Sequence, residues 1–144
     1  MVSLLDVNVL VALFDGVHVH HEAAHAWFVA HREFGWATCP LTENGLVRVV
    51  SSSAYPGRRT TLADALSRLA TLRSSGHHHF WEDSVSLCDA GRVDATRIGG
   101  PRRITDTYLL ALAVANEGRL VTFDREITPA AVRGATSRQL LHPG

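Results

Sequence analysis

Four carboxylates stand where the sequence changes from one expected structural element to the next. Asp6 and Asp124 each follow a short apolar run with the pattern of a strand, whereas Glu43 and Asp106 lie in the first turns of expected helices. In a parallel sheet joined by helices, the carboxyl ends of the strands and the starts of the helices meet along one edge. We therefore expect these four acids to lie close together.

A cluster of this kind predicts a particular chemistry. Four carboxylates within a few ångströms repel one another and become partly protonated unless cations lie between them. Oxygen ligands favour Mg²⁺ or Mn²⁺ over zinc. Such ions hydrolyse phosphodiesters by activating a water molecule and stabilising the leaving oxygen. The alternative for each acid taken alone is helix capping, and Asp6 suits an N-cap equally well.

The segment 104–124 carries two of these acids and predicts a helix, a tight turn and a strand. Thr105 suits the N-cap, which places Asp106 in the first turn, where a negative charge suits the helix dipole. Residues 108–115 are apolar almost throughout, so we expect this helix to be covered on both sides. Gly118 stands where a C′ glycine would end the helix, and the residues after it have the pattern of a short strand.

The other elements alternate in the same way along the chain. Expected strands cover residues 2–5, 35–39, 77–82 and 137–141, and expected helices cover 9–14, 20–34, 42–50 and 60–74. Apolar strands that lead directly into helices predict a mainly parallel sheet covered on both faces. We predict a three-layer α/β/α sandwich with about five strands, formed by one domain over residues 1–144. In the helix at 60–74, the residues expected to face the core are Leu62, Ala65, Leu66, Leu69 and Leu72.

Histidines offer a second kind of site. Residues His21–His25 match the H-E-x-x-H pattern of zinc peptidases, in which two histidines one helical turn apart bind the metal. In the expected helix, however, Trp27 and Phe34 define the apolar face, and the two histidines lie opposite it, towards solvent. His77 and His79 share one side of an expected strand and form another possible metal pair.

The composition limits the classes of partner. The 14 basic residues, all arginine, and the 14 acidic residues cancel, so attraction to a polyanion would have to be local. The pairs Arg58–Arg59 and Arg102–Arg103 are either solvated surface or phosphate contacts, and their spacing does not decide between these. No apolar run approaches the ~20 residues that span a bilayer, and we expect a cytoplasmic protein.

Three segments resemble the PIN-domain ribonucleases, and in particular the VapC toxins of bacterial toxin–antitoxin pairs. The segments are LLDVNVLVALF, TENGLVRV and ITDTYLLALAVANEGRLVTFDRE, in an order and spacing that match almost the whole chain. The resemblance implies a Mg²⁺-dependent endoribonuclease, with Mn²⁺ as a substitute. It also implies an RNA substrate, a homodimer and a VapB-like antitoxin whose tail blocks the acidic groove.

The same resemblance assigns roles to individual residues. Asp6 and Asp106 correspond to the direct Mg²⁺ ligands, and Asn8 to the hydrogen-bonding companion of Asp6. Glu43 and Asp124 correspond to acids that act through water. Two alternatives remain beside this interpretation: a zinc metallopeptidase that uses the helix at His21–His25, and a non-catalytic PIN-like binding module.

Overall fold

The computed structural model describes all residues from 1 to 144 and contains one five-stranded, entirely parallel sheet. The strand order across the sheet is β3-β2-β1-β4-β5. The strands are β1 (Ser3–Leu5), β2 (Trp36–Thr38), β3 (His78–Phe80), β4 (Arg119–Val121) and β5 (Leu140–Leu141).

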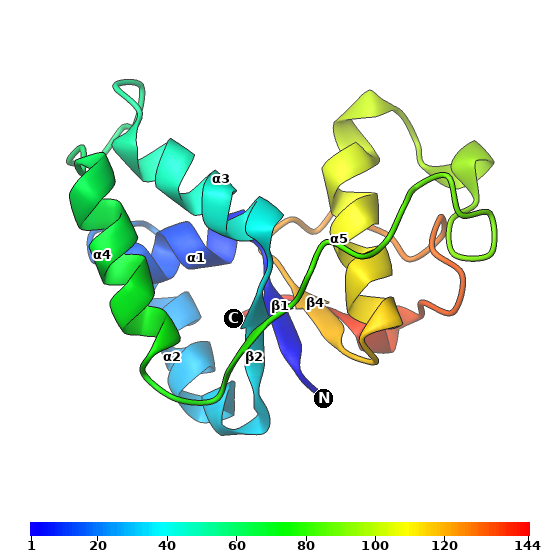
Figure 1. The fold of residues 1–144 in the computed structure, drawn as a ribbon, viewed down its shortest axis with the longest axis horizontal. Helices are drawn as coiled ribbons and strands as arrows, with labels where there is room; N and C mark the ends of the chain where they lie inside the picture. Colours follow the sequence, from blue (N-terminus) through cyan, green and yellow to red (C-terminus); the bar gives the residue numbers. More distant parts are fainter.

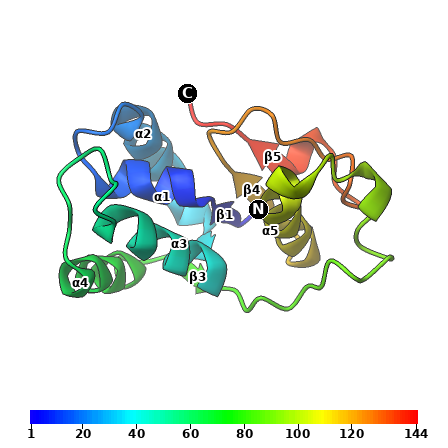
Figure 2. The same ribbon diagram turned by 90° about the horizontal axis from the view of Figure 1, so that it is seen from above.

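Helices cover both faces of the sheet, as Figures 1 and 2 show. Four helices pack on one face and α5 lies on the other, beside the long segment that leads from β3 to α5. The prediction of a three-layer α/β/α fold with five strands is therefore confirmed. The helices are α1 (Val7–Phe14), α2 (His21–His31), α3 (Pro40–Ser51), α4 (Leu62–Arg73) and α5 (Ile104–Ala115). None of them is long and apolar enough to cross a membrane.

The chain adds its later strands on the opposite side of β1 from its earlier ones. The chain places β2 and then β3 on one side of β1, and afterwards places β4 and β5 on the other side. Ligands of open parallel sheets bind beyond the carboxyl ends of the strands at such a switch point. The register pairs Leu5 with Val121, so the residues that follow these two strands, Asp6 and Thr122, are neighbours at this edge.

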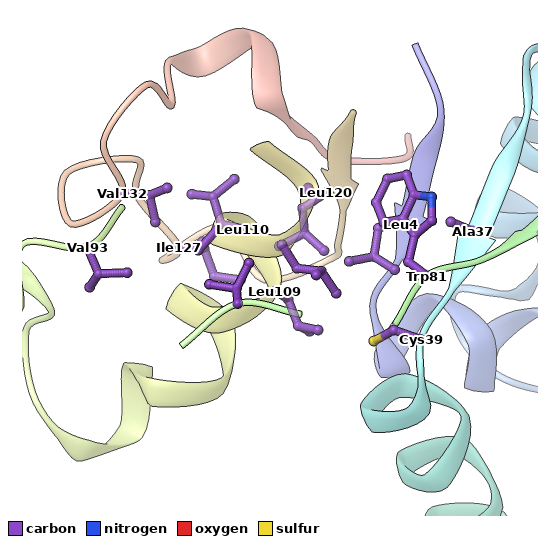
Figure 3. Packing of buried hydrophobic residues seen from close by; sticks show 14 residues of the cluster. Leu4, Ala37, Cys39, Trp81, Val93, Leu109, Leu110, Leu120, Ile127 and Val132 are labelled. Atoms are coloured by element: carbon purple, nitrogen blue, oxygen red, sulfur yellow. The ribbon is translucent and has the colours of Figure 1, made fainter. Parts of the chain in front are cut away.

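The helix α5 is buried on nearly all sides, as its sequence predicts. Leu109, Leu110 and Leu112 are all 0% exposed. Figure 3 shows α5 leucines between the strand residue Leu4 on one side and Val132, from the C-terminal segment, on the other. Each buried leucine contributes roughly 1.5–3 kcal/mol, so this packing holds the middle of α5 firmly against the sheet.

The start of α5 differs from the prediction. Thr105 is not the N-cap, because a 3₁₀ turn at Pro101–Arg103 runs directly into the helix, whose first residue is Ile104. The cap residue is Arg103, which makes no side-chain capping bond. Asp106 nevertheless lies in the first turn, so the expected placement of this acid holds.

The end of α5 is a Schellman motif in which the left-handed residue is Glu117, with φ of 56°, and not Gly118. The amide of Glu117 donates to the carbonyl of Val114, and the amide of Gly118 donates to that of Ala113. Glycine is needed at 118 for a different reason: a Cβ there would lie 2.5 Å from the carbonyl oxygen of Val2.

The apolar faces of α2 and α4 also differ from the predictions. In α2 the buried residues are Ala24, Trp27 and Phe28. Phe34 is exposed because the helix ends at His31 and a 3₁₀ turn changes the periodicity. In α4, Ala65 and Leu69 are buried, Leu72 is partly buried, and Leu62 and Leu66 are exposed. This helix packs mainly on α3, which covers a narrower stripe than a sheet would.

Candidate active site

Asp6 links the end of β1 to the start of α1. One carboxylate oxygen, Oδ1, accepts a hydrogen bond of 2.7 Å from the amide of Val7 and so caps α1. The other, Oδ2, accepts a hydrogen bond of 2.7 Å from the hydroxyl of Thr122. The residue is only 7% exposed, and burial raises the pKa of Asp6, although these two bonds partly oppose the rise. The Asp6 side chain therefore caps α1 with one oxygen and is held at the edge of the sheet by the other.

Thr122 is the centre of the hydrogen bonds at this edge. While its hydroxyl donates to Asp6, the same oxygen accepts from Asn8 Nδ2 at 3.1 Å and from the amide of Asp124 at 3.1 Å. Asn8 in turn accepts from the amide of Phe123 at 3.1 Å. The sequence prediction included Asn8 but missed Thr122. In the sequence, Thr122 is recognisable as a hydroxyl residue that follows an apolar strand and stands two residues before an acid. At this spacing a hydroxyl side chain commonly forms a hydrogen bond with the backbone.

Asp106 and Asp124 are held together by an arginine of the same chain. Arg103 Nη1 lies 3.3 Å from Asp106 Oδ2 and 3.2 Å from Asp124 Oδ2, and its Nη2 contacts Glu126. Burial raises the pKa of Asp106, with nearby Asp124 acting in the same direction, while the hydrogen bond from Arg103 lowers it. The guanidinium thus compensates two carboxylates that would otherwise repel each other.

Three of the four predicted acids line one cavity. This acid cavity has a volume of about 440 Å³, and its lining residues are Asp6, Val7, Asn8, Val11, His18, Val49, Tyr55, Pro56, Asp106 and Asp124. The acids come from three places in the sequence: the end of β1, the first turn of α5 and the loop after β4. The fold therefore brings Asp6, Asp106 and Asp124 together at the switch point of the sheet.

Glu43 does not line the acid cavity. Its carboxylate accepts a hydrogen bond of 2.5 Å from the Thr38 hydroxyl and pairs with Arg73 at 3.3 Å. It faces a neighbouring depression between α3 and α4. The start of α3 nevertheless lies close against the start of α1. The contact at Gly45 shows this, since a Cβ on this glycine would come within 2.6 Å of Val7. Glu43 thus stays near the cavity but is engaged elsewhere.

The donors of the acid cavity fit a hard divalent cation. Its acids supply carboxylate oxygens, which suit Mg²⁺ and Mn²⁺, and neither cysteine of the chain lines it. As the side chains stand, no group of three or more His, Cys, Asp or Glu residues is close enough together to hold a metal ion. In this structure the cation that contacts both Asp106 and Asp124 is the guanidinium of Arg103.

The histidine pairs are arranged differently from a metal site. His21 Nδ1 donates to the carbonyl of Ala12 at 2.7 Å, and His25 stacks on His21 with 5.7 Å between ring centroids. His21 is therefore engaged with α1, and His25 is the exposed member of the pair. His77 precedes β3 in a left-handed conformation, with φ of 64°, so it does not share a regular strand face with His79.

Comparison with known proteins agrees with this geometry. Residues 3–132 match the family model described as "PIN domain". The chain is 49% identical over 140 residues to ribonuclease VapC44 of Mycobacterium tuberculosis, covering 97% of this chain and 98% of that protein. It is 45% identical over 134 residues to ribonuclease VapC39 of the same species, covering 93% and 96%.

The chain belongs to the VapC ribonucleases of the PIN-domain family. The fold of this VapC protein also matches a solved structure of VapBC2 from Rickettsia felis bound to a DNA fragment from their promoter. That match has a TM-score of 0.63 and covers 100% of both chains at 15% identity. VapC nucleases of the PIN family are typically metal-dependent, which agrees with the oxygen donors of the acid cavity.

The role of Thr122 in this VapC protein can be tested with an isosteric change. Thr122→Val should lower the free energy of unfolding by about 1–3 kcal/mol, because Asp6 loses its hydroxyl donor and Asn8 loses one of its two acceptors. RNA cleavage should fall by about 10–100-fold, the usual effect of losing a group that orients a metal ligand. Urea unfolding and a cleavage assay measure both effects. Thr122→Ser keeps the hydroxyl and should behave almost as wild type; equal losses in both variants would contradict this role.

Proposed function

We propose that the protein is a Mg²⁺-dependent endoribonuclease that hydrolyses RNA phosphodiester bonds as the toxin of a VapBC-type pair. The observation that carries this proposal is the convergence of Asp6, Asp106 and Asp124 on one cavity at the switch point of the sheet. A structural role explains the helix cap by Asp6, but it does not explain three partly desolvated acids in the same cavity.

In this proposal Asp6 and Asp106 would hold Mg²⁺, while Glu43 and Asp124 would act on it through water. When bound, Mg²⁺ would lower the pKa of the attacking water and compensate charge on the phosphate. Thr122 and Asn8 hold the Asp6 carboxylate in one orientation. Glu43 must leave Arg73 to take part, so its role depends on a rearrangement.

Arg103 has two sets of partners in the structure, the pair Asp106 and Asp124 on one side and Glu126 on the other. We propose that it withdraws from the two aspartates when a metal ion binds and keeps its contact with Glu126. Asp106 and Asp124 would then exchange one compensating cation for another.

The partners follow from the family. We propose a cognate VapB-like antitoxin whose tail covers the acid cavity, and a homodimer of this chain as the active unit. The VapBC2 complex of Rickettsia felis supports the antitoxin, because it shows this fold in a complex named for both components. An RNA substrate places the activity in the cytoplasm, and we propose that residues 1–144 act as one nuclease domain.

The ends of the cleaved RNA test the reaction. Attack of water on phosphorus should leave a 5′-phosphate and a 3′-hydroxyl, as mass spectrometry of a cleaved oligonucleotide would show. A substrate with a single 2′-deoxynucleotide at the cleaved position should still be cut, because the 2′-hydroxyl takes no part. Cyclic 2′,3′-phosphate ends would show that the RNA 2′-hydroxyl is the nucleophile and would contradict hydrolysis by water at the acid cavity.

A further inference from the structure

Three arginines gather beside the acid cavity without a carboxylate partner. Arg58, Arg59 and Arg68 are exposed and line a depression of about 360 Å³ that has no apolar lining. Its complete lining is Arg58, Arg59, Thr60, Thr61, Asp64, Ser67 and Arg68. Arg73, Arg92 and Arg103 each form an ion pair with a carboxylate, whereas none of these three does. In a chain whose formal net charge is zero, three arginines against one carboxylate, Asp64, make a local excess of positive charge.

Two of these guanidinium groups are held in place by neutral groups. Arg68 donates to the carbonyl of Phe14 at 2.6 Å, and its guanidinium lies 3.6 Å from the centre of the Phe14 ring. Arg59 donates to the carbonyl of Ser51 at 2.9 Å. These contacts restrict the side chains but leave their charge and further N–H donors available. A fixed guanidinium with free donors suits a phosphate group.

A third, smaller depression lies between the arginine depression and the acid cavity. Its volume is about 190 Å³, and it shares Arg58, Thr60 and Arg68 with the arginine depression and Tyr55 with the acid cavity. The hydroxyl of Tyr55 donates to Asp15 Oδ2 at 2.5 Å, which holds the ring at the junction. Adjoining depressions thus lead from the cavity acids to the three arginines.

We propose that Arg58, Arg59 and Arg68 bind the sugar–phosphate backbone of single-stranded RNA on one side of the cleaved bond. This proposal rests on the nuclease function proposed above and names where its substrate lies. The acids of the cavity repel a phosphodiester chain, so the nucleotides beyond the cleaved bond need cations of their own. Contacts of this kind position the strand and carry no sequence information.

The binding test uses the full chain with Asp106→Asn, so that RNA stays intact, and a fluorescent single-stranded oligonucleotide. Adding Arg58→Ala and Arg59→Ala should weaken binding about tenfold and reduce the slope of log K against log salt by about 1.4, since each single-strand phosphate contact contributes about 0.7. The matched control, Arg97→Ala with Arg138→Ala, also removes two exposed arginines, which line none of these depressions. It should bind as the parent does.

A substitution that removes a negative charge provides a second test, because it should strengthen RNA binding instead of weakening it. Asp64→Asn removes the carboxylate of the arginine depression and should tighten RNA binding, with thermal melting used to show that each variant folds. In the cleavage-competent protein, the Arg58 and Arg59 variant should raise KM and leave kcat unchanged. An unchanged salt slope, or an equal loss in the control pair, would overturn the proposal. The binding experiment decides it even if the protein fails to cleave RNA, so it can fail separately from the nuclease function.

Discussion

Replacing Asp106 by Asn should lower the rate of RNA cleavage by about two to four orders of magnitude. The change keeps the size of the side chain and an oxygen for Arg103, but it removes one charge from the acid cavity. A directly bound metal ion contributes several kcal/mol to the reaction, and each 1.36 kcal/mol corresponds to about tenfold in rate. Steady-state cleavage of a labelled RNA measures the effect.

Asp106 is a cleaner target than Asp6. In Asp6→Asn the new amide N–H₂ would face a donor in either orientation, because Val7 donates to one carboxylate oxygen and Thr122 and Asn8 donate to the other. A loss of activity in that variant would therefore mix a loss of charge with a loss of structure. Asp106 contacts only Arg103 among the hydrogen-bonded side chains, so its replacement separates the two effects.

Without metal, the Asp106→Asn variant should be as stable as wild type or more stable. It loses a helix-dipole contribution of only about 0.3–1 kcal/mol and the charge of its ion pair with Arg103, while burial of a charge and repulsion from Asp124, which oppose these terms, disappear. Because the folded-state pKa of Asp106 lies above 3.8, the folded wild type takes up a proton more readily than the unfolded chain. Relative to the variant, wild type should therefore gain stability as the pH falls from neutral through that pKa towards 3.8.

Magnesium should reverse this order. Binding to the folded state adds RT ln(1 + [L]/Kd) to stability, so excess Mg²⁺ should raise the Tm of wild type more than that of the variant. Melting curves of both proteins with and without Mg²⁺ give this comparison. If the variant cleaves RNA normally and gains the same Mg²⁺ shift, Asp106 is a first-turn anion of α5 and the proposed site is wrong.

Leu110→Ala should lower the free energy of unfolding by about 2–5 kcal/mol, because a fully buried leucine leaves a cavity when it is truncated. This is a large part of the 5–15 kcal/mol that typically stabilises a domain. The matched control is Leu66→Ala on α4, where the residue is 56% exposed and the change should cost less than about 0.5 kcal/mol. Urea denaturation compares the two, and similar losses would contradict the packing described for α5.

The sequence predicts the layers and most of the site for identifiable reasons. Strands that lead directly into helices indicate a parallel sheet, and the positions of Asp6, Asp106 and Asp124 at element boundaries follow from that topology alone. Periodicity does not reveal how wide a surface a helix will cover, which is why Leu62 and Leu66 were wrongly assigned to the core. The helix α4 meets only a stripe of α3, whereas α5 is enclosed.

Side-chain partners were harder to predict than element boundaries. Glu43 lies at its expected place in the first turn of α3, yet Thr38 and Arg73 hold its carboxylate outside the acid cavity. Thr122 was missed because its role depends on the β1–β4 register, which pairs residues more than 100 positions apart. Arg103 stands only three residues before Asp106, but its second contact, with Asp124, needs the same long-range pairing.

The most direct test of a metal-dependent acid site is RNA cleavage by the purified protein at several metal conditions, beside the Asp106→Asn variant. We expect cleavage with Mg²⁺ or Mn²⁺, none in EDTA, and recovery when Mg²⁺ is restored in excess. The variant, prepared in the same way, should stay inactive throughout and so excludes a contaminating ribonuclease. Full activity in EDTA, or recovery with zinc alone, would contradict the site formed by Asp6, Asp106 and Asp124.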